Sequence, residues 1–277
     1  MGLCSLDRRW VYSHWFDEDT LQSYPIKFSD EPGYEDIHQP LQLDDGTQVI
    51  PKEMKYVVVF LHEMGKEGIA AAPTLHQYAE TQYAYSKISF TAIAVAEFIR
   101  GLGYHAIPSA NCTALNVPLA IDAGLGQLGR HGKLINPLFG PRCRISKVIT
   151  DLPLAVDSPI DFGVTEFCNQ CQKCAQYCPT GAISLGERSF EPVNNCNNGG
   201  YLQWPMDHKK CNQYWAEVGT NCGICIRVCP FNKERAKIHD VVRWFIKNLK
   251  IADPLFLRLD DALGYGKYRS PDRLWHE

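Results

Sequence analysis

Short apolar runs and one helical repeat alternate along the first part of the chain. The run KYVVVFLHEM at 55–64 is rich in β-branched residues and predicts a strand. YHAIPS at 104–109 and SKVITDLPL at 146–154 predict two further strands. A helix is predicted between the first two, because apolar residues recur at helical spacing before GLGY ends the pattern, at Ile88, Ala92, Val95, Phe98, Ile99 and Leu102. This alternation predicts a layered sheet with helices packed on it.

The opening residues MGLCSLDRRWVYSH predict the end of a strand that runs directly into a loop. No element precedes that strand, so we expect the chain to begin partway into a domain. Neither a run of about 18 apolar residues nor a basic segment followed by an apolar one is present, so the sequence predicts no membrane span and no secretory signal.

Composition adds two limits to this pattern. With 277 residues, of which 45% are hydrophobic, the chain is long enough for a substantial core and a smaller second domain. The formal net charge is −3 and no long Lys or Arg run occurs, so the sequence lacks the electrostatic signature of a nucleic-acid-binding protein.

Twelve cysteines are present, and eight of them follow a pattern that disulfide frameworks do not show. Two runs, C-x2-C-x2-C-x3-C-P and C-x10-C-x2-C-x3-C-P, place three thiolates on one tight loop and end at a proline. A cubane iron–sulfur cluster requires this spacing, whereas zinc sites use pairs of C-x2-C. In such runs the fourth cysteine binds the other cluster.

We therefore assign one [4Fe–4S] cluster to Cys168, Cys171, Cys174 and Cys229, and a second to Cys178, Cys211, Cys222 and Cys225. Four cysteines remain outside the pattern, and a buried structural thiol is expected for each of them, at Cys4, Cys112, Cys143 and Cys196. Of these four, Cys196 is close enough in sequence to compete with Cys211 as a ligand.

A glycine-rich stretch at 116–147 contains Gly124, Gly126, Gly129 and Gly132. It does not match a dinucleotide-binding fingerprint, because the glycines do not follow a strand in G-x-G-x-x-G register. Repeated glycine fits a backbone that approaches a large flat partner or adopts positive φ. From the residues alone, both a cofactor loop and a packing loop are open, and packing is favoured.

The chain resembles the corrinoid-dependent reductive dehalogenases in several segments. These are AYSKISFTAIAVAEFIRGLGYHAIPSAN, PLAIDAGLGQLGRHGKLINPLFGPRCRISKVITDLPL, the two cysteine runs and the following CPFNK. The resemblance covers nearly the whole chain, from LDRRWVYSH to LGYGKYRSPDRLWHE. It implies that an export leader, a variable region and the first elements of the corrinoid-binding domain are missing.

Epoxyqueuosine reductase is a second family that the chain resembles, through the AGLG element and the paired cluster motifs. That family modifies a tRNA base. Four features favour the dehalogenases over this second family. They are the GPRCR segment, the AYS segment at a helix start, the absence of a helical-repeat extension and the absence of a basic surface. The D-x-H-x-x-G lower-ligand motif is absent, so the resemblance implies a base-off corrinoid.

The resemblance implies an α+β fold in three parts. A nitroreductase-like corrinoid-binding catalytic domain is expected at 1–160, and a bacterial ferredoxin-like domain with two [4Fe–4S] clusters at 161–240. A C-terminal segment at 241–277 is expected to pack back on the core.

The same resemblance assigns roles to individual residues. Tyr85 matches a proton-donating tyrosine, Arg144 an arginine that favours its phenolate and stabilises developing negative charge, and Asn111 an amide that orients the substrate. Arg142, two positions from Arg144, could exchange roles with it. Thr81 and Trp204 are expected to line the substrate pocket. Corrinoid contacts are expected from Gly124, Leu125, Gly126, Gly129, Arg130, His131 and Gly132.

The function implied is reductive dehalogenation of small organohalides, such as chlorinated ethenes, at a cobalt corrinoid supplied with electrons by the two clusters. A membrane anchor protein, a low-potential electron donor and a homodimer are the implied partners, and no nucleic acid is expected. The implied location is the outer face of the cytoplasmic membrane, or the cytoplasm for this chain without a leader. The alternatives are an epoxyqueuosine-reductase-like enzyme and an electron-transfer protein that carries clusters but no corrinoid.

Overall fold

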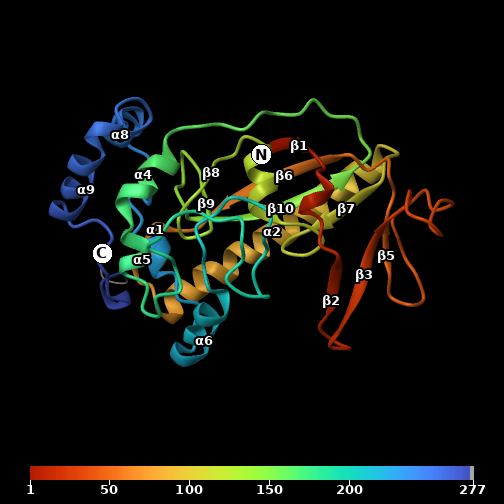
Figure 1. Ribbon diagram of the computed structural model, residues 1–277, viewed down its shortest axis with the longest axis horizontal. Helices are drawn as coiled ribbons and strands as arrows, with labels where there is room; N and C mark the ends of the chain where they lie inside the picture. Colours follow the sequence, from red (N-terminus) through yellow and green to blue (C-terminus); the bar gives the residue numbers. More distant parts are fainter. Residues whose placement is uncertain (275–277) are drawn as a thin grey trace. The chain divides into compact units, whose positions relative to one another are not determined.

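The structure is a computed structural model, and it describes residues 1–274 (Figure 1). The chain divides into two compact units. The first comprises Met1–His62, Tyr85–Leu125 and Arg144–Pro159, and the second comprises Glu63–Ala84, Gly126–Cys143 and the described residues from Ile160 onward. Two segments that precede the cysteine runs in sequence therefore group with them. The predicted three-part division at 160 and 240 stays a prediction, and its last three residues lie outside the described part.

The central sheet of the first unit has the strand order β1-β6-β10-β7. These strands are β1 (Gly2–Ser5), β6 (Tyr56–Glu63), β7 (Ala106–Ser109) and β10 (Cys143–Thr150). β1 pairs with β6 and β10 pairs with β7, both antiparallel. Three of these strands were expected from the apolar runs and β1 from the opening residues, although the strand predicted at 146–154 lies at Cys143–Thr150. The α+β class is confirmed. The nitroreductase-like assignment stays a prediction.

The long helix α2 (Leu75–Gly101) packs the later part of its length against this sheet. Ala92, Ala96 and Ile99 form a buried cluster with Val58 of β6 and Val148 of β10. Small alanines at helical spacing let the helix backbone approach the strands closely. The helix begins well before Ile88, where the periodic pattern was detected.

The predicted apolar face of this helix is wrong at two positions. The side chains of Phe98 and Leu102 are 66% and 53% exposed. Phe98 precedes the buried Ile99 by one residue, so it projects from a different side of α2, and Leu102 lies in the turn after the helix ends at Gly101.

A second sheet in the first unit was not predicted from the sequence. It has the order β2-β3-β5-β4, from β2 (His14–Asp17), β3 (Gln22–Phe28), β4 (Leu41–Gln42) and β5 (Gln48–Ile50). β2 and β3 form an antiparallel pair, and β3 runs parallel to β5, as Figure 1 shows. The unit also contains η1 (Arg8–Trp10) and α3 (Asn116–Asp122).

The second unit is built mainly from short helices around the cysteine runs. Besides the first residues of α2, its elements are α1 (Lys66–Ala70), β8 (Gln127–Leu128), β9 (Leu134–Ile135), α4 (Val164–Cys171), α5 (Lys173–Gln176), α6 (His208–Val218), α7 (Ile224–Arg227), α8 (Lys237–Asn248), η2 (Lys250–Ala252), α9 (Asp253–Ala262) and η3 (Pro271–Leu274). Phe167 and Phe231 meet edge to face with their ring centroids 5.1 Å apart. Together with Cys168, Cys229 and Trp204, they belong to one buried cluster, so the cysteines lie inside the core of this unit.

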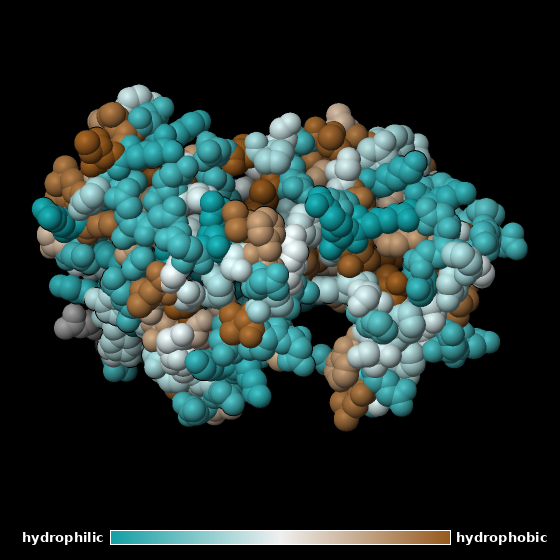
Figure 2. Space-filling view, in the orientation of Figure 1, coloured by the Kyte–Doolittle hydropathy of each residue, from teal (hydrophilic) through white to brown (hydrophobic). Residues whose placement is uncertain are grey.

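Helices α8 and α9 pack beside α4, where Ile246 is buried in the same cluster as Phe167. The outer sides of the two helices remain apolar, and Figure 2 shows hydrophobic side chains gathered over them. The most exposed of these are Ile238, Trp244, Ile251, Leu255 and Leu263. A groove of about 360 Å³, lined mostly by apolar residues of α8 and α9, opens between them.

Candidate functional site

Three residues that were predicted as catalytic lie together in the first unit. Tyr85 projects from α2, Asn111 follows β7, and Arg144 is in β10. The side-chain nitrogen of Asn111 donates a hydrogen bond to the phenolic oxygen of Tyr85 over 3.2 Å. The central guanidinium carbon of Arg144 is 5.1 Å from the centroid of the Tyr85 ring. The fold therefore brings a phenol, a hydrogen-bond donor and a cation to one place.

This arrangement suits proton release from the phenol. Arginine stays protonated at any physiological pH, and its cation over the ring face is attracted by the ring quadrupole. Both the cation and the hydrogen bond from Asn111 stabilise negative charge on the phenolic oxygen. Tyr85 and Arg144 are half-buried and Asn111 is exposed, so a small molecule can reach the group.

Asn111 is held by two further polar residues that sequence reasoning missed. Asn116, at the start of α3, donates through its side-chain nitrogen to the side-chain oxygen of Asn111 over 3.0 Å. Lys147 in β10 donates to the side-chain oxygen of Asn116 over 2.7 Å. The Lys147 ammonium also donates to the backbone oxygens of Ala110 and Cys112, at 3.0 and 3.1 Å.

Lys147 is completely buried, and burial lowers the pKa of its ammonium to about 7. An ammonium can only donate hydrogen bonds, so it fixes the oxygen of Asn116 toward itself. The Asn116 nitrogen then faces Asn111, and the Asn111 nitrogen faces Tyr85. The placement of a lysine next to Val148 and Ile149 in a predicted strand was the sequence signal for this group.

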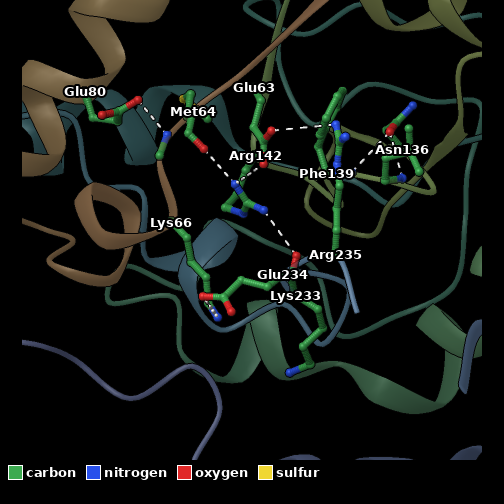
Figure 3. A network of polar contacts seen from close by, with 12 residues as sticks. Glu63, Met64, Lys66, Glu80, Asn136, Phe139, Arg142, Lys233, Glu234 and Arg235 are labelled. Atoms are coloured by element: carbon green, nitrogen blue, oxygen red, sulfur yellow. Dashed lines mark hydrogen bonds and ion pairs between the residues drawn. The ribbon is translucent and has the colours of Figure 1, made fainter. Parts of the chain in front are cut away.

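Arg142 and Arg144 occupy different environments, although either could have been the catalytic arginine by sequence. Arg142 is 2% exposed and belongs to the second unit. Its guanidinium donates to the carboxylate of Glu63 at 2.9 Å and to the backbone oxygens of Met64 and Lys233 at 2.7 and 3.1 Å (Figure 3). These contacts join three separate segments, so Arg142 is a structural residue in this network.

The first predicted cluster quartet lines one cavity in the second unit. Cys168, Cys171, Cys174 and Cys229 all contribute to its wall. Burial raises the pKa of Cys168 to about 11 and that of Cys171 to about 12. Burial also raises the pKa of Cys229, and the neighbouring charges of Cys168, Cys171 and Cys174 raise it further. Three of these thiols are buried and Cys171 is half-buried, and four thiols at such close quarters become thiolates only when cationic iron is present, so the donor set fits a [4Fe–4S] cluster.

The second predicted quartet is also brought together. Burial raises the pKa of Cys222 to about 11, and the charges of Cys225, Cys211 and Cys178 act in the same direction. The charge of Cys225 also raises the pKa of Cys174, so the two quartets adjoin each other. Two clusters held by these sets would be close enough for electrons to pass from one to the other.

The remaining cysteines show different degrees of burial. The expectation of a buried thiol is confirmed for Cys4 and Cys143, and it is wrong for Cys112 and Cys196, which are exposed. Cys196 hydrogen-bonds its neighbour Asn195, whereas Cys211 interacts with the charges of Cys178 and Cys225. This placement favours Cys211 as the ligand.

All twelve cysteines lie in the described part of the chain, and none of them forms a disulfide there. Within residues 1–274, no three His, Cys, Asp or Glu side chains are placed to hold a single metal ion. A cubane cluster, with one iron for each cysteine sulfur, needs wider ligand spacing than a single zinc ion does.

Two glycines of the predicted cofactor loop are required by close backbone approaches within the protein. A Cβ at Gly124, where φ is +69°, would lie 2.6 Å from the backbone oxygen of Ser158 in the first unit. A Cβ at Gly126 would lie 2.3 Å from the backbone oxygen of Ile135 in the second unit. Packing therefore accounts for both glycines, and corrinoid contacts by Gly124, Leu125, Gly126, Gly129 and Gly132 stay predictions.

Arg130 and His131 were predicted to contact the corrinoid, and both lie buried beside the cysteine loop of the second unit. Arg130 donates from Nε to the backbone oxygen of Cys168 at 3.1 Å, and from Nη1 to the backbone oxygens of Ser184 and Gly186. Its guanidinium also stacks on Trp204, 5.1 Å from the ring centroid. Arg130 therefore fastens its loop to the segment that carries Cys168.

The two residues predicted to line the substrate pocket are fully buried in the second unit. Thr81 is 0% exposed, accepts a hydrogen bond from Gln77 over 2.8 Å and directs its hydroxyl toward the sulfur of Met64. Trp204 is 1% exposed in the cluster with Phe167. Their predicted role in substrate binding stays a prediction.

Comparison with known families identifies the class of the cysteine-containing region first. Residues 167–232 match the model of the 4Fe-4S double cluster binding domain, which confirms two [4Fe–4S] clusters as the cofactors of this region. Residues 21–154 match the model described as reductive dehalogenase subunit. The chain is therefore similar to the reductive dehalogenases, as the sequence resemblance implied.

Curated relatives extend this similarity along nearly the whole chain. Tetrachloroethene reductive dehalogenase of Sulfurospirillum multivorans is 43% identical over 279 residues, which cover 99% of this chain and 56% of that protein. A tetrachloroethene reductive dehalogenase of Desulfitobacterium hafniense is 35% identical, over 98% of this chain and 52% of its own length. The chain therefore spans about half the length of the curated relatives it matches.

Solved structures show the same relationship. The catabolic reductive dehalogenase NpRdhA aligns with a TM-score of 0.76 at 29% identity, covering 96% of this chain and 34% of that chain. A reductive dehalogenase structure whose description concerns a mechanism of B12-dependent dehalogenation aligns equally well. An epoxyqueuosine reductase of Lactococcus garvieae is 30% identical over 43% of this chain and 32% of its own length, so that likeness is partial.

Among residues 1–274, no helix is both long and apolar enough to cross a membrane.

Proposed function

We propose that this chain forms the catalytic core of a reductive dehalogenase that replaces halogen by hydrogen in small organohalides such as chlorinated ethenes. The observation that carries the proposal is the contact of Tyr85 with Asn111 and Arg144. A phenol with a donor and a cation beside it can deliver a proton, but it contains no reductant. The electrons must come from bound cofactors, and the paired cysteine sets fit two clusters.

A cobalt corrinoid, when bound, supplies the low-potential electrons that break a carbon–halogen bond. The family relationship and the B12-dependent dehalogenase of similar fold support this cofactor. The first cluster is proposed on Cys168, Cys171, Cys174 and Cys229, and the second on Cys178, Cys211, Cys222 and Cys225.

Each polar residue then has a defined task. Tyr85 donates its phenolic proton to the carbon that loses halide. Arg144 stabilises the negative charge that this leaves on the phenolic oxygen, and Asn111 does the same through its N–H donor. Because the phenolic oxygen accepts from Asn111, its own proton points elsewhere and is available to a substrate. This assignment selects Arg144 and leaves Arg142 as a structural residue.

The test uses protein produced anaerobically with cobamide supplied. We expect about one cobalt and about eight irons per chain, as one corrinoid and two [4Fe–4S] clusters require. Halide release is then measured with tetrachloroethene and trichloroethene under a low-potential donor. Iron without cobalt would instead indicate an electron carrier, and zinc in place of iron would refute the cluster assignment.

Tyr85→Phe is the matched variant, because it removes only the hydroxyl. It should keep both metals and lose halide release by roughly 10²-fold or more, the usual contribution of a positioned general acid. Full activity in this variant would exclude Tyr85 as the proton donor.

We also propose, on family similarity alone, that the protein works at the outer face of the cytoplasmic membrane with an anchor protein and a low-potential donor, and forms a homodimer. Fractionation of cells that express the complete gene, followed by size-exclusion chromatography, tests these points. A monomer recovered from the cytosolic fraction would contradict them.

A further inference from the structure

His131 lies in the turn between β8 and β9 of the second unit and is 1% exposed. Its Nδ1 atom is 3.2 Å from the backbone nitrogen of Lys133. A backbone N–H can only donate, so Nδ1 must be the accepting, unprotonated nitrogen of the ring. The imidazole proton is therefore on Nε2.

The Nε2 atom of His131 is buried and has no hydrogen-bond partner among the described residues. Buried donors without a partner are rare in native proteins. The imidazole lines the same cavity as Cys168, Cys171, Cys174 and Cys229. A group bound in this cavity would therefore supply the acceptor that Nε2 lacks.

We infer that the Nε2–H group of His131 donates a hydrogen bond to a sulfur atom of the [4Fe–4S] cluster held by Cys168, Cys171, Cys174 and Cys229, and thereby sets the reduction potential of that cluster. The inference rests on the cluster assignment of the proposed function. Thiolate and sulfide are the acceptors that a cubane cluster presents, and hydrogen bonds to cluster sulfur are a known determinant of potential.

The fold holds the imidazole in a fixed position relative to the cysteine loop. The turn is closed by backbone hydrogen bonds from Gly129 to Lys133 and from Gly132 to Gly129, each of 2.9 Å. A Cβ at Gly129 would lie 2.7 Å from the His131 ring carbon Cε1, so only glycine leaves room for the ring. Arg130, in the same turn, is bonded to the backbone oxygen of Cys168.

The hydrogen bond has a predictable direction of effect. One-electron reduction adds negative charge to the cluster, so a donor to its sulfur stabilises the reduced state more than the oxidised one. The potential of this cluster rises accordingly. None of Cys178, Cys211, Cys222 and Cys225 lines the cavity of His131, so the second cluster lacks this contribution.

The test compares His131→Leu, which removes the donor, with His131→Gln, whose amide N–H can reach a similar position. Both clusters are titrated in the 277-residue protein by redox titration with electron paramagnetic resonance, without corrinoid or substrate. His131→Leu should shift one midpoint to a more negative potential and leave the other unchanged, and His131→Gln should restore part of the shift. His62→Leu is the control, because His62 also has an unpartnered Nε2 but does not line the cavity.

Resonance Raman spectra of the parent in H₂O and D₂O give a second measurement that needs no variant to fold. Exchange of the Nε2 proton should shift iron–sulfur stretching bands, and those isotope shifts should weaken in His131→Leu. Unchanged potentials and unchanged isotope shifts in a parent that holds both clusters would overturn the inference alone. A parent that takes up no cluster would overturn it together with the cluster assignment, and absence of dehalogenation would leave this measurement unaffected.

Discussion

The guanidinium carbon of Arg144 lies 5.1 Å from the centre of the Tyr85 ring. Arg142, on the same stretch of chain, instead makes its hydrogen bonds with Glu63 and with backbone carbonyls. Of two arginines two positions apart, Arg144 therefore has the proposed catalytic role, and Arg142 makes structural contacts.

We predict opposite phenotypes for Arg144→Gln and Arg142→Gln. Arg144→Gln should reduce halide release by roughly 10²-fold, because a charge that stabilises the phenolate is removed, with little change in melting temperature. Arg142→Gln should cost about 1–3 kcal/mol of stability, because buried acceptors lose their donor. Thermal melts and steady-state rates on both variants check this, and equal rate losses would contradict the assignment.

Hydrogen bonds link Lys147 through Asn116 and Asn111 to Tyr85. A substitution at Asn116 can interrupt this series without removing the buried charge of Lys147. Asn116→Asp keeps an oxygen for Lys147 but turns a second oxygen toward Asn111, which must then rotate and present its own oxygen to Tyr85. The phenolic proton would be drawn to Asn111, so halide release should fall by roughly 10-fold or more. Unchanged melting together with reduced turnover is the expected pair of results.

Asn116→Ser serves as the control for this variant, since its hydroxyl can accept from Lys147 without imposing a second acceptor on Asn111. It should retain more activity than Asn116→Asp. The reverse order would show that the orientation of Asn111 does not depend on Asn116.

The grouping of Cys229 with the first run can be tested separately from the rest. Cys229→Ser should perturb the cluster that His131 faces and leave the spectrum of the other cluster intact, whereas Cys196→Ser should change neither. Iron content and electron paramagnetic resonance of the reduced proteins provide the measurement. Loss of a cluster in Cys196→Ser would favour Cys196 over Cys211 as a ligand.

Ionisation of Asp253, at the start of α9, lowers the stability of the folded protein, so the contribution of this residue to stability depends on pH. Both of its carboxylate oxygens are buried and have no hydrogen-bond partner within residues 1–274. Burial, with the nearby charge of Glu166, raises its pKa to about 6. Between pH 4 and pH 6 the folded protein therefore binds more protons than the unfolded chain, so this group makes stability fall as pH rises. Above pH 6, Asp253→Asn should be more stable than the parent by about 1–3 kcal/mol.

The advantage of Asp253→Asn should shrink toward zero near pH 4, where the parent carboxyl is protonated in the folded state. Melting temperatures of parent and variant at pH 4.5 and pH 7.5 compare the two conditions. A difference independent of pH would mean that the effect of the substitution is not electrostatic.

Sequence patterns predicted the strands of the central sheet where apolar and β-branched residues cluster, as in VVVF of β6 and VIT of β10. They missed the sheet formed by β2, β3, β4 and β5, whose short strands mix polar and apolar residues and depend on pairing between distant segments. The start of α2 was missed for a related reason. Gln77 and Thr81 are buried polar residues there, and their burial is not visible in a hydropathy pattern.

The residues of the candidate site were predictable from the sequence where they belong to a recognisable motif. The cysteine spacing grouped the eight cluster ligands, and the family resemblance selected Tyr85, Asn111 and Arg144. Lys147, Asn116 and His131 were not assigned their present roles, since a single polar residue has no periodicity or spacing from which its neighbours could be read. Their roles follow from hydrogen-bond direction, which only the folded structure supplies.

The sharing of cysteines between the two runs also bears on how the protein is made. Cys229 meets Cys168, Cys171 and Cys174, and Cys178 meets the second run, so each quartet is completed only when both runs have left the ribosome. A cell cannot finish one iron–sulfur centre on the nascent chain and add the other later. Delivery of iron and sulfide to both centres is therefore expected only after synthesis of the C-terminal run.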